Sequence, residues 1–172
     1  LATDAIEELR RLVAFDTTSR GSNLELIEYV EQKLGSLGAS LKRVPNHDGT
    51  KTNLIGMIGP EVEGGVVLSG HTDVVPVDGQ PWTADPWTLT DKGDGRLYGR
   101  GTCDMKGFIA LALAAAPEFA KQALKRPVHF AFSYDEEIGC LGSPFLIERL
   151  VADGPRPALV IVGEPTDMVA VS

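Results

Sequence analysis

Five side chains that can ligate a divalent metal stand far apart in the 172-residue chain, each beside an apolar run or the start of a helix. They are His71, Asp104, Glu136, Glu137 and Glu164. Imidazole nitrogen and carboxylate oxygen together suit Zn²⁺, Mn²⁺ or Co²⁺ better than a metal that selects thiolates. If the fold gathers these carboxylates in one place, their negative charges would repel one another and raise the pKa of each. Bound cations would remove that repulsion. The residue types therefore indicate a metal site if the fold brings them together.

Three apolar runs precede four of these ligands and predict the strands that position them. The runs are 66–69, 128–134 and 158–162. They show little polar alternation, which is typical of strands covered on both faces. Helices predicted over 105–124 and 144–152 separate the strands, and this order predicts a three-layer α/β/α domain. Because ligands bind beyond the carboxyl ends of strands in such sheets, we expect the five side chains to converge there.

The N-terminal third predicts two helices followed by two strands. Helical spacing of apolar residues covers 4–14, and the Ser22–Glu25 spacing of a capping box opens a second helix that runs to Leu34. Strands are predicted over 41–44 and 53–58. The segment 76–99 is rich in Gly, Pro, Trp and Asp, and we expect a long surface loop there.

A pair of metal ions bridged by a carboxylate and a water would form a hydrolytic centre. Asp73, two residues after His71, could accept the ring N–H that the metal does not use. A free glutamate could take the proton of the attacking water, and the sequence leaves open which of Glu136 and Glu137 does so.

Each of these residues also has a purely structural interpretation. His71 could be a hydrogen-bonded histidine at the rim, and Asp104 could cap the following helix. Glu136 and Glu137 could lie at a solvated strand end, and Glu164 could belong to an ordinary turn before Pro165. Taken together, four occurrences of such residues at the ends of predicted strands or helices favour the metal site over these structural interpretations.

The remaining histidines and the cysteines predict no second reactive centre. His129 lies within an apolar run and is expected to be a packed, hydrogen-bonded core residue, and His47 is expected in a solvated turn. Cys103 and Cys140 are too few for a disulfide framework, and neither is marked as a nucleophile. This cysteine usage favours a reducing cytoplasm.

Composition and missing motifs narrow the function classes. The net charge of −8 argues against a nucleic-acid partner and does not suggest an anionic membrane surface. No apolar stretch approaches the roughly 20 residues of a membrane span, and no secretory leader is visible. The chain has no G-x-S-x-G elbow and no P-loop, which disfavours a serine hydrolase and a nucleotide-binding domain.

Four ordered motifs give the chain a specific resemblance. They are Ser69-Gly70-His71-Thr72-Asp73, Gly99-Arg100-Gly101-Thr102-Cys103-Asp104-Met105-Lys106-Gly107, Asp135-Glu136-Glu137 and Gly163-Glu164-Pro165-Thr166. Over nearly the whole chain this pattern resembles the M20 metallopeptidases, which implies the catalytic domain of a zinc exopeptidase. The residues within these motifs are most similar to those of family members that remove the acetyl group of N-acetylornithine in arginine biosynthesis.

The resemblance also implies roles for the five ligands. His71 and Glu164 would bind the first zinc ion, Asp104 would bridge both ions, and Glu137 would bind the second. Glu136 would be the general base and Asp73 would orient His71. The peptide bond between Asp104 and Met105 is expected to be cis.

Members of the family are about twice as long as this chain, so residues 1–172 are expected to be the N-terminal segment of the catalytic domain. A lid domain through which members dimerise, and a C-terminal segment with a last histidine ligand, would be absent here. We therefore expect the segment alone to hold the first metal better than the second and to hydrolyse little. The implied substrate is a small N-acyl amino acid, and the alternatives are a desuccinylase of succinyl-diaminopimelate, another M20 peptidase, or a catalytically silent metal-binding or interaction fragment.

Overall fold

The computed structural model describes residues 2–167 and 169 and contains four helices and seven strands within that part of the chain. In chain order these are α1 (Ala2–Val13), α2 (Leu24–Ser36), β1 (Ser40–Pro45), β2 (Thr52–Ile58), β3 (Val66–His71), β4 (Thr90–Asp91), β5 (Leu97–Tyr98), α3 (Lys106–Lys121), β6 (Val128–Ser133), α4 (Ser143–Asp153) and β7 (Leu159–Val162).

Five strands form one mixed sheet in the order β1-β2-β6-β3-β7. β3 pairs in parallel with both β6 and β7, so the three strands expected to carry the ligands are neighbours. Their carboxyl ends meet at one edge of the sheet, as predicted. β2 runs antiparallel to β6, and β1 runs antiparallel to β2, so the N-terminal hairpin extends a parallel core on one side.

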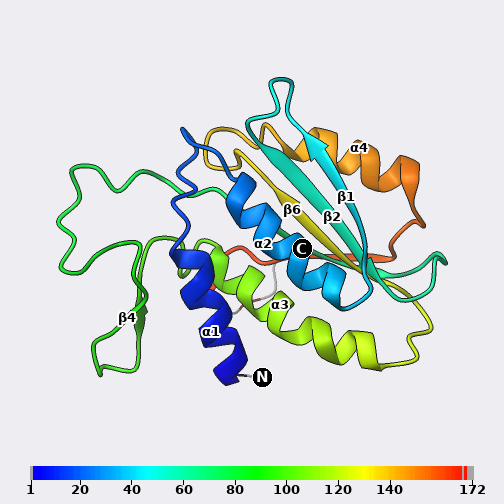
Figure 1. The fold of residues 1–172 in the computed structure, drawn as a ribbon, viewed down its shortest axis with the longest axis horizontal. Coiled ribbons are helices and arrows are strands. Elements are labelled where there is room, and N and C mark those ends of the chain that lie inside the picture. Colours follow the sequence, from blue (N-terminus) through cyan, green and yellow to red (C-terminus); the bar gives the residue numbers. More distant parts are fainter. Residues whose placement is uncertain (1, 168, 170–172) are drawn as a thin grey trace.

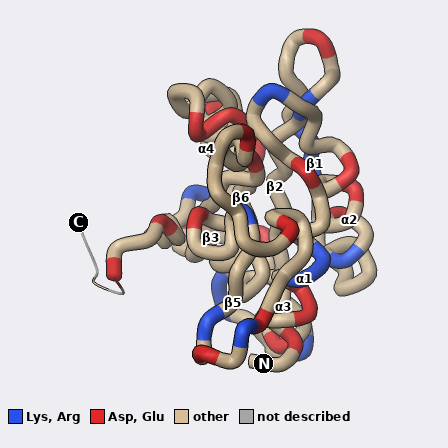
Figure 2. Tube along the Cα trace, turned by 90° about the vertical axis from the view of Figure 1, so that its left-hand side faces the viewer, with Lys and Arg blue, Asp and Glu red and all other residues tan. Residues whose placement is uncertain are grey.

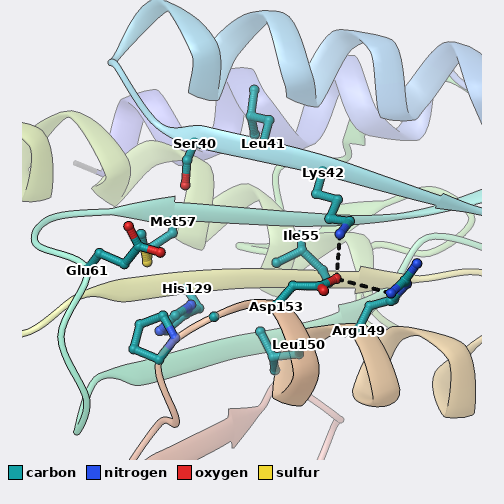
Figure 3. A pocket seen from close by; sticks show the side chains of 12 residues that line it. Ser40, Leu41, Lys42, Ile55, Met57, Glu61, His129, Arg149, Leu150 and Asp153 are labelled. Atoms are coloured by element: carbon teal, nitrogen blue, oxygen red, sulfur yellow. Dashed lines mark hydrogen bonds and ion pairs between the residues drawn. The ribbon is translucent and has the colours of Figure 1, made fainter.

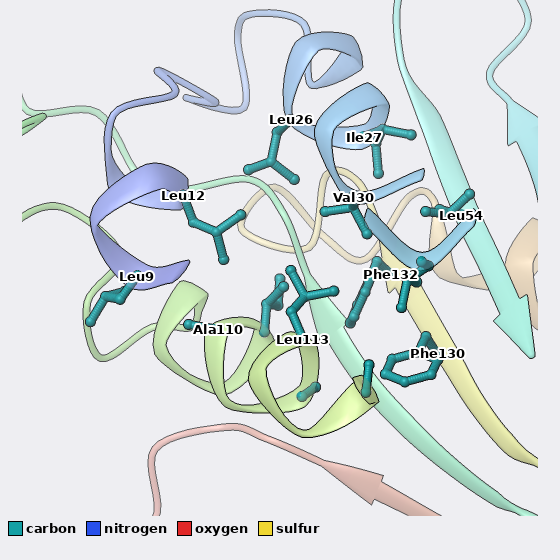
Figure 4. Packing of buried hydrophobic residues seen from close by; sticks show 14 of the residues in the cluster. Leu9, Leu12, Leu26, Ile27, Val30, Leu54, Ala110, Leu113, Phe130 and Phe132 are labelled. Carbon is teal, nitrogen blue, oxygen red and sulfur yellow. The ribbon is translucent and has the colours of Figure 1, made fainter. Parts of the chain in front are cut away.

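Helices α1, α2 and α3 cover one face of the sheet and enclose the main core (Figures 1 and 4). Leu12 of α1, Val30 of α2 and Leu113 of α3 are fully buried against Phe130 and Phe132 of β6. The alternation of β6 places both phenylalanines on this face. Burying one such side chain contributes about 1.5–3 kcal/mol, so this core supplies much of the energy that holds the sheet edge in place.

In the part of the chain that the structure describes, α4 is the one helix on the opposite face of the sheet, across the strands from the other three helices (Figure 1). Leu146 and Leu150 of α4 pack on Val67 and Ala131, whose neighbours along the strands point to the first core. The structure thus has three layers, and the predicted α/β/α architecture is confirmed.

The loop after β3 contains a feature that the sequence pattern did not predict. A two-stranded ribbon, β4–β5, stands within the expected surface loop 76–99, which extends away from the helices in Figure 1. Gly93 and Gly95 supply the positive φ values of its turn. Leu89 is buried in the main core and anchors the loop to the body.

The predicted helix boundaries differ from the observed ones by one to three residues. The capping box does not form, because Asn23 is the N-cap of α2 and its side chain bonds to Thr52 and Thr72 instead. Ser22 still accepts a hydrogen bond from the Leu24 N–H. The third helix ends at Lys121 rather than 124, where the backbone of Gln122 becomes extended.

Charged residues are distributed around the whole trace rather than gathered on one face (Figure 2). The net charge of −8 therefore does not by itself mark the site. No helix in the described part of the chain is long and apolar enough to cross a bilayer. Within residues 2–167 and 169, β7 has a sheet neighbour, β3, on one side only, and its four residues are all exposed.

Candidate metal centre

His71 ends β3 and is 1% exposed. Its Nδ1 lies 2.9 Å from the backbone carbonyl oxygen of Asp73 and 3.5 Å from the Asp73 carboxylate. A proton on Nδ1 would be donated to that carbonyl, which leaves the Nε2 lone pair available to a metal. The orientation expected from Asp73 is present, but the nearer acceptor is its carbonyl group rather than its carboxylate.

Asp73 connects His71 to the next strand end. Its buried carboxylate accepts hydrogen bonds from the backbone N–H of Glu136 at 3.0 Å, the N–H of Glu137 at 3.2 Å and the Ser19 hydroxyl at 2.6 Å. Burial opposes ionisation of Asp73, but these donors and His71 together hold its pKa below the usual value. The ionised carboxylate therefore fixes the backbone that presents both glutamates.

Asp104 lies before α3 but does not cap it, because the N-cap is Met105 and no side-chain cap bond forms. The structural alternative for Asp104 is thus wrong. Its Oδ1 lies 3.0 Å from Nε2 of His71, and the side chain is about half exposed. The peptide bond from Asp104 to Met105 is cis, as the family resemblance implied.

Glu136 and Glu137 lie in the loop between β6 and α4. The buried side chain of Asn53, on β2, is hydrogen-bonded to both ends of this loop. Asn53 accepts a hydrogen bond from the N–H of Tyr134 at 3.1 Å and donates one to the carbonyl of Gly142 at 2.9 Å. Within the loop, Sγ of Cys140 lies 3.5 Å from Oε1 of Glu136. The loop is therefore held in place by side-chain contacts that have no local sequence signal.

Glu164 follows β7, and its Oε1 lies 3.7 Å from Nε2 of His71. The residue before it has no room for a side chain, since a Cβ on Gly163 would lie 1.9 Å from Cγ of Phe108. The close approach of α3 to the end of β7 thus requires glycine there. This contact fixes the point at which Glu164 enters the site.

All five predicted ligands converge, and they form two overlapping groups that share His71. One contains His71, Asp104 and Glu137, and the other contains His71, Glu136 and Glu164. In each group the potential ligand atoms lie within 4.8 Å of one another.

The electrostatics of the cluster fit a cation. Burial, together with neighbouring carboxylates such as Asp104, raises the pKa of Glu137 and of Glu164. Burial opposes protonation of His71, but Asp73, Asp104 and Glu164 outweigh it and raise its pKa to about 9. Anionic groups are thus crowded enough to favour a proton or a metal ion among them, and one imidazole with several carboxylates is a donor set that zinc accepts.

Three residues that support the site were not singled out as functional by the sequence reasoning. Ser19 donates to Asp73, Lys51 pairs with Asp135 and with the Ser19 carbonyl, and Asn53 closes the glutamate loop. Their partners are 32 to 89 residues away in the chain, so no local pattern could have predicted these contacts. A polar residue at the start of an otherwise apolar strand, as at Asn53, is the one available signal.

The other predicted residues lie outside the cluster or beside it. His47 is exposed in its turn, as expected, and both cysteines are exposed and free. His129 is buried, but its Nε2 has no hydrogen-bond partner, so the expectation of a hydrogen-bonded core histidine was wrong at that atom. Lys106 is fully buried, and burial lowers its pKa to about 7 while its Nζ donates to the carbonyl of Phe15.

Known proteins are similar to this chain in sequence, and solved structures are similar to it in fold. The acetylornithine deacetylase of Myxococcus xanthus is 43% identical over 168 residues, covering 95% of this chain and 42% of the relative. The enzyme of the same name from Proteus mirabilis is 38% identical over 171 residues, covering 95% and 43%. The chain thus spans about two fifths of the length of these relatives.

Two solved structures have a fold similar to that of this chain. Human carnosine dipeptidase 1 superposes with a TM-score of 0.78 at 26% identity, covering 93% of this chain and 38% of that one. An M20 metallo-carboxypeptidase from Sulfolobus solfataricus has the same TM-score at 22% identity and shares the fold. The model of peptidase family M20/M25/M40 matches residues 67–172, the stretch that holds all five converging side chains. By that match the chain belongs to peptidase family M20/M25/M40, a family of metallohydrolases.

Proposed function

We propose that the protein is a zinc-dependent amide hydrolase that converts N2-acetyl-L-ornithine to L-ornithine and acetate. The observation that carries this proposal is the convergence of four carboxylates with His71 at one sheet edge, three of them within 3.8 Å of its Nε2. Relatives at about 40% identity are named acetylornithine deacetylase, which supports the choice of substrate.

In this proposal His71 and Glu164 would hold one zinc ion, Glu137 would hold the second, and Asp104 would be a ligand available to both. Bound zinc would supply an acidified water and a polarised acyl carbonyl. Glu136 takes the proton of the attacking water on its carboxylate and returns it to the departing nitrogen of ornithine. Asp73 holds the imidazole of His71 in place and, through the two backbone N–H groups, also holds both glutamates.

We further propose that residues 1–172 form the first segment of a catalytic domain, with a lid and dimerisation domain and a further ligand supplied elsewhere in a longer protein. The chain's share of about two fifths of its relatives supports this division. The 172-residue chain by itself should then bind one zinc ion more tightly than the second and hydrolyse little. Turnover by this chain at the rate of the whole protein would contradict the division without affecting the assignment of the metal site.

A comparison of substrates tests the proposed activity. Whole, zinc-loaded protein should hydrolyse N2-acetyl-L-ornithine with a kcat/KM at least about 100-fold above that for N-succinyl-diaminopimelate or a β-alanyl dipeptide. Glu136→Gln should lower kcat by about 10²–10⁴-fold while zinc content is retained. Glu148→Gln, on the exposed surface of α4, serves as the control. A preference for the succinylated substrate would favour a desuccinylase, and zinc binding without turnover of any substrate would favour a silent metal-binding protein.

A further inference from the structure

A second cavity lies between α4 and the β1–β2 hairpin, and we call it the α4 cavity (Figure 3). Its volume is about 280 Å³, which is enough for a molecule the size of an amino acid. It shares no lining residue with the metal centre. Its walls come from β1, β2, β6 and α4, elements that the rigid core holds in place.

His129 of β6 lines the α4 cavity and carries a hydrogen-bonding nitrogen that the protein does not use. The residue is 2% exposed, and its Nε2 has no partner. Burial lowers the pKa of His129, which favours the neutral form of the ring. A buried polar atom without a partner costs free energy, and a neutral imidazole can accept a hydrogen bond from a donor brought by a ligand.

The charges that line the α4 cavity are separated into two ends. At one end Lys42 and Arg149 both approach the single carboxylate of Asp153, Arg149 at 3.6 Å, which leaves one positive charge in excess. Figure 3 shows Glu61 at the other end, on the same side as His129. In the part of the chain that the structure describes, no cation lies within ion-pair distance of Glu61.

An apolar surface connects the two ends. Ile55 and Met57 of β2 and Leu150 of α4 line the cavity between Glu61 and the Lys42–Asp153–Arg149 group (Figure 3). Such a surface suits a ligand whose middle part is a chain of methylene groups. A polar middle part would find no hydrogen-bond partner there.

We infer that the α4 cavity binds an elongated zwitterion, in which an aliphatic chain separates one carboxylate from one ammonium group. The carboxylate lies against Lys42 and Arg149, and the ammonium donates to Glu61 and His129. An aliphatic acid alone would leave Glu61 unpaired, and an aliphatic amine alone would leave the excess positive charge uncompensated. This site is independent of the proposed deacetylase activity.

Binding can be followed at His129 itself in the whole protein labelled with ¹⁵N-histidine. The probe is 6-aminohexanoate, and its binding is read at His129, which is not part of the metal centre. Hexanoate, hexylamine and glycine are the comparison probes. The His129 signals, assigned with a His129→Gln variant, should shift saturably with a dissociation constant of about 1 mM, as expected for so small a ligand.

Variants on the surface keep the test independent of folding. Glu61→Gln and Arg149→Gln should each weaken 6-aminohexanoate by at least about fivefold. Glu63→Gln, an exposed neighbour outside the cavity, should not. Hexanoate, hexylamine and glycine should each bind at least about fivefold more weakly than the aminohexanoate. Equal shifts with hexanoate, no effect of Glu61→Gln, or no saturable shift of His129 would overturn the inference.

Discussion

His71 is the residue on which the site depends, and its surroundings give it two distinct states. Without a metal it is a buried imidazole facing Asp104 and Glu164, and its pKa of about 9 keeps it protonated at neutral pH. As a metal ligand it must be neutral. The same carboxylates that hold the proton are therefore the ones that would hold the ion that replaces it.

Zinc binding should release the proton of His71. For the metal-free 172-residue chain at pH 7.5 we expect about one proton released per first zinc ion, falling towards zero as the pH passes 9, because His71 is then already neutral. Calorimetric titration in buffers of different ionisation enthalpy measures this number. Asp73→Asn removes the largest cause of the raised pKa and should reduce the release. Binding with no proton release at pH 7.5 would contradict the protonated state of His71.

The same pKa shift gives a pH dependence of stability without metal. The pKa of His71 is raised from 6.5 in the unfolded chain to about 9 in the folded one. Its contribution to the free energy of unfolding is therefore fully present below pH 6.5 and is lost as the pH rises through 9. A metal-free His71→Gln variant should not show this loss in urea unfolding measured at pH 6 and at pH 9.5.

At the scale of elements, the sequence predicted the three strands that end in ligands because their apolar runs and their order along the chain are local signals. It did not predict the β4–β5 ribbon, since each strand has two residues and no pattern can form over that length. Nor did it predict the contacts of Ser19 and Asn53, because these depend on which distant strands become neighbours. The ligand types were thus readable from the sequence, whereas the groups that hold them in place required the fold.

The close contact between β7 and α3 should be sensitive to one methyl group. In Gly163→Ala the new Cβ would meet the ring of Phe108 at 1.9 Å, so Glu164 must move or the helix must shift. We expect a loss of about 1–3 kcal/mol in the free energy of unfolding, as for an overpacked core, together with weaker zinc binding. Urea unfolding and a zinc titration measure the two effects.

Gly154→Ala provides the matched control, because its Cβ would meet only the Leu150 carbonyl oxygen at 3.7 Å and its backbone is extended. That variant should keep both the stability and the zinc affinity of the parent chain. If Gly163→Ala behaved in the same way, the end of β7 would not be fixed by Phe108.

At the scale of the whole molecule, the lateral edge of the sheet formed by β7 is open and apolar. It is distinct from the end of the sheet where the metal centre lies. The residues of β7 are between 43% and 58% exposed, and among the described residues their backbone pairs with β3 only. Even a short edge strand that is exposed and apolar offers unpaired N–H and C=O groups to another chain. The 172-residue chain in isolation is therefore expected to self-associate through β7.

A charge on this edge should oppose the association. Val160→Lys places a cation in the middle of β7, whereas Val62→Lys places one at an exposed position away from the sheet and is the control. Sedimentation of the 172-residue chain over a range of concentrations should show association that Val160→Lys reduces and Val62→Lys does not. A parent chain that stays monomeric throughout would contradict the role of the edge.

The most direct test of the metal centre is the anomalous scattering of zinc in crystals of the protein. We predict a peak about 2.0–2.2 Å from Nε2 of His71, with carboxylate oxygens of Asp104 and Glu164 at similar distances. Zinc bound only elsewhere, such as at the exposed Cys103 or Cys140, with none beside His71, would contradict a metal site at this sheet edge.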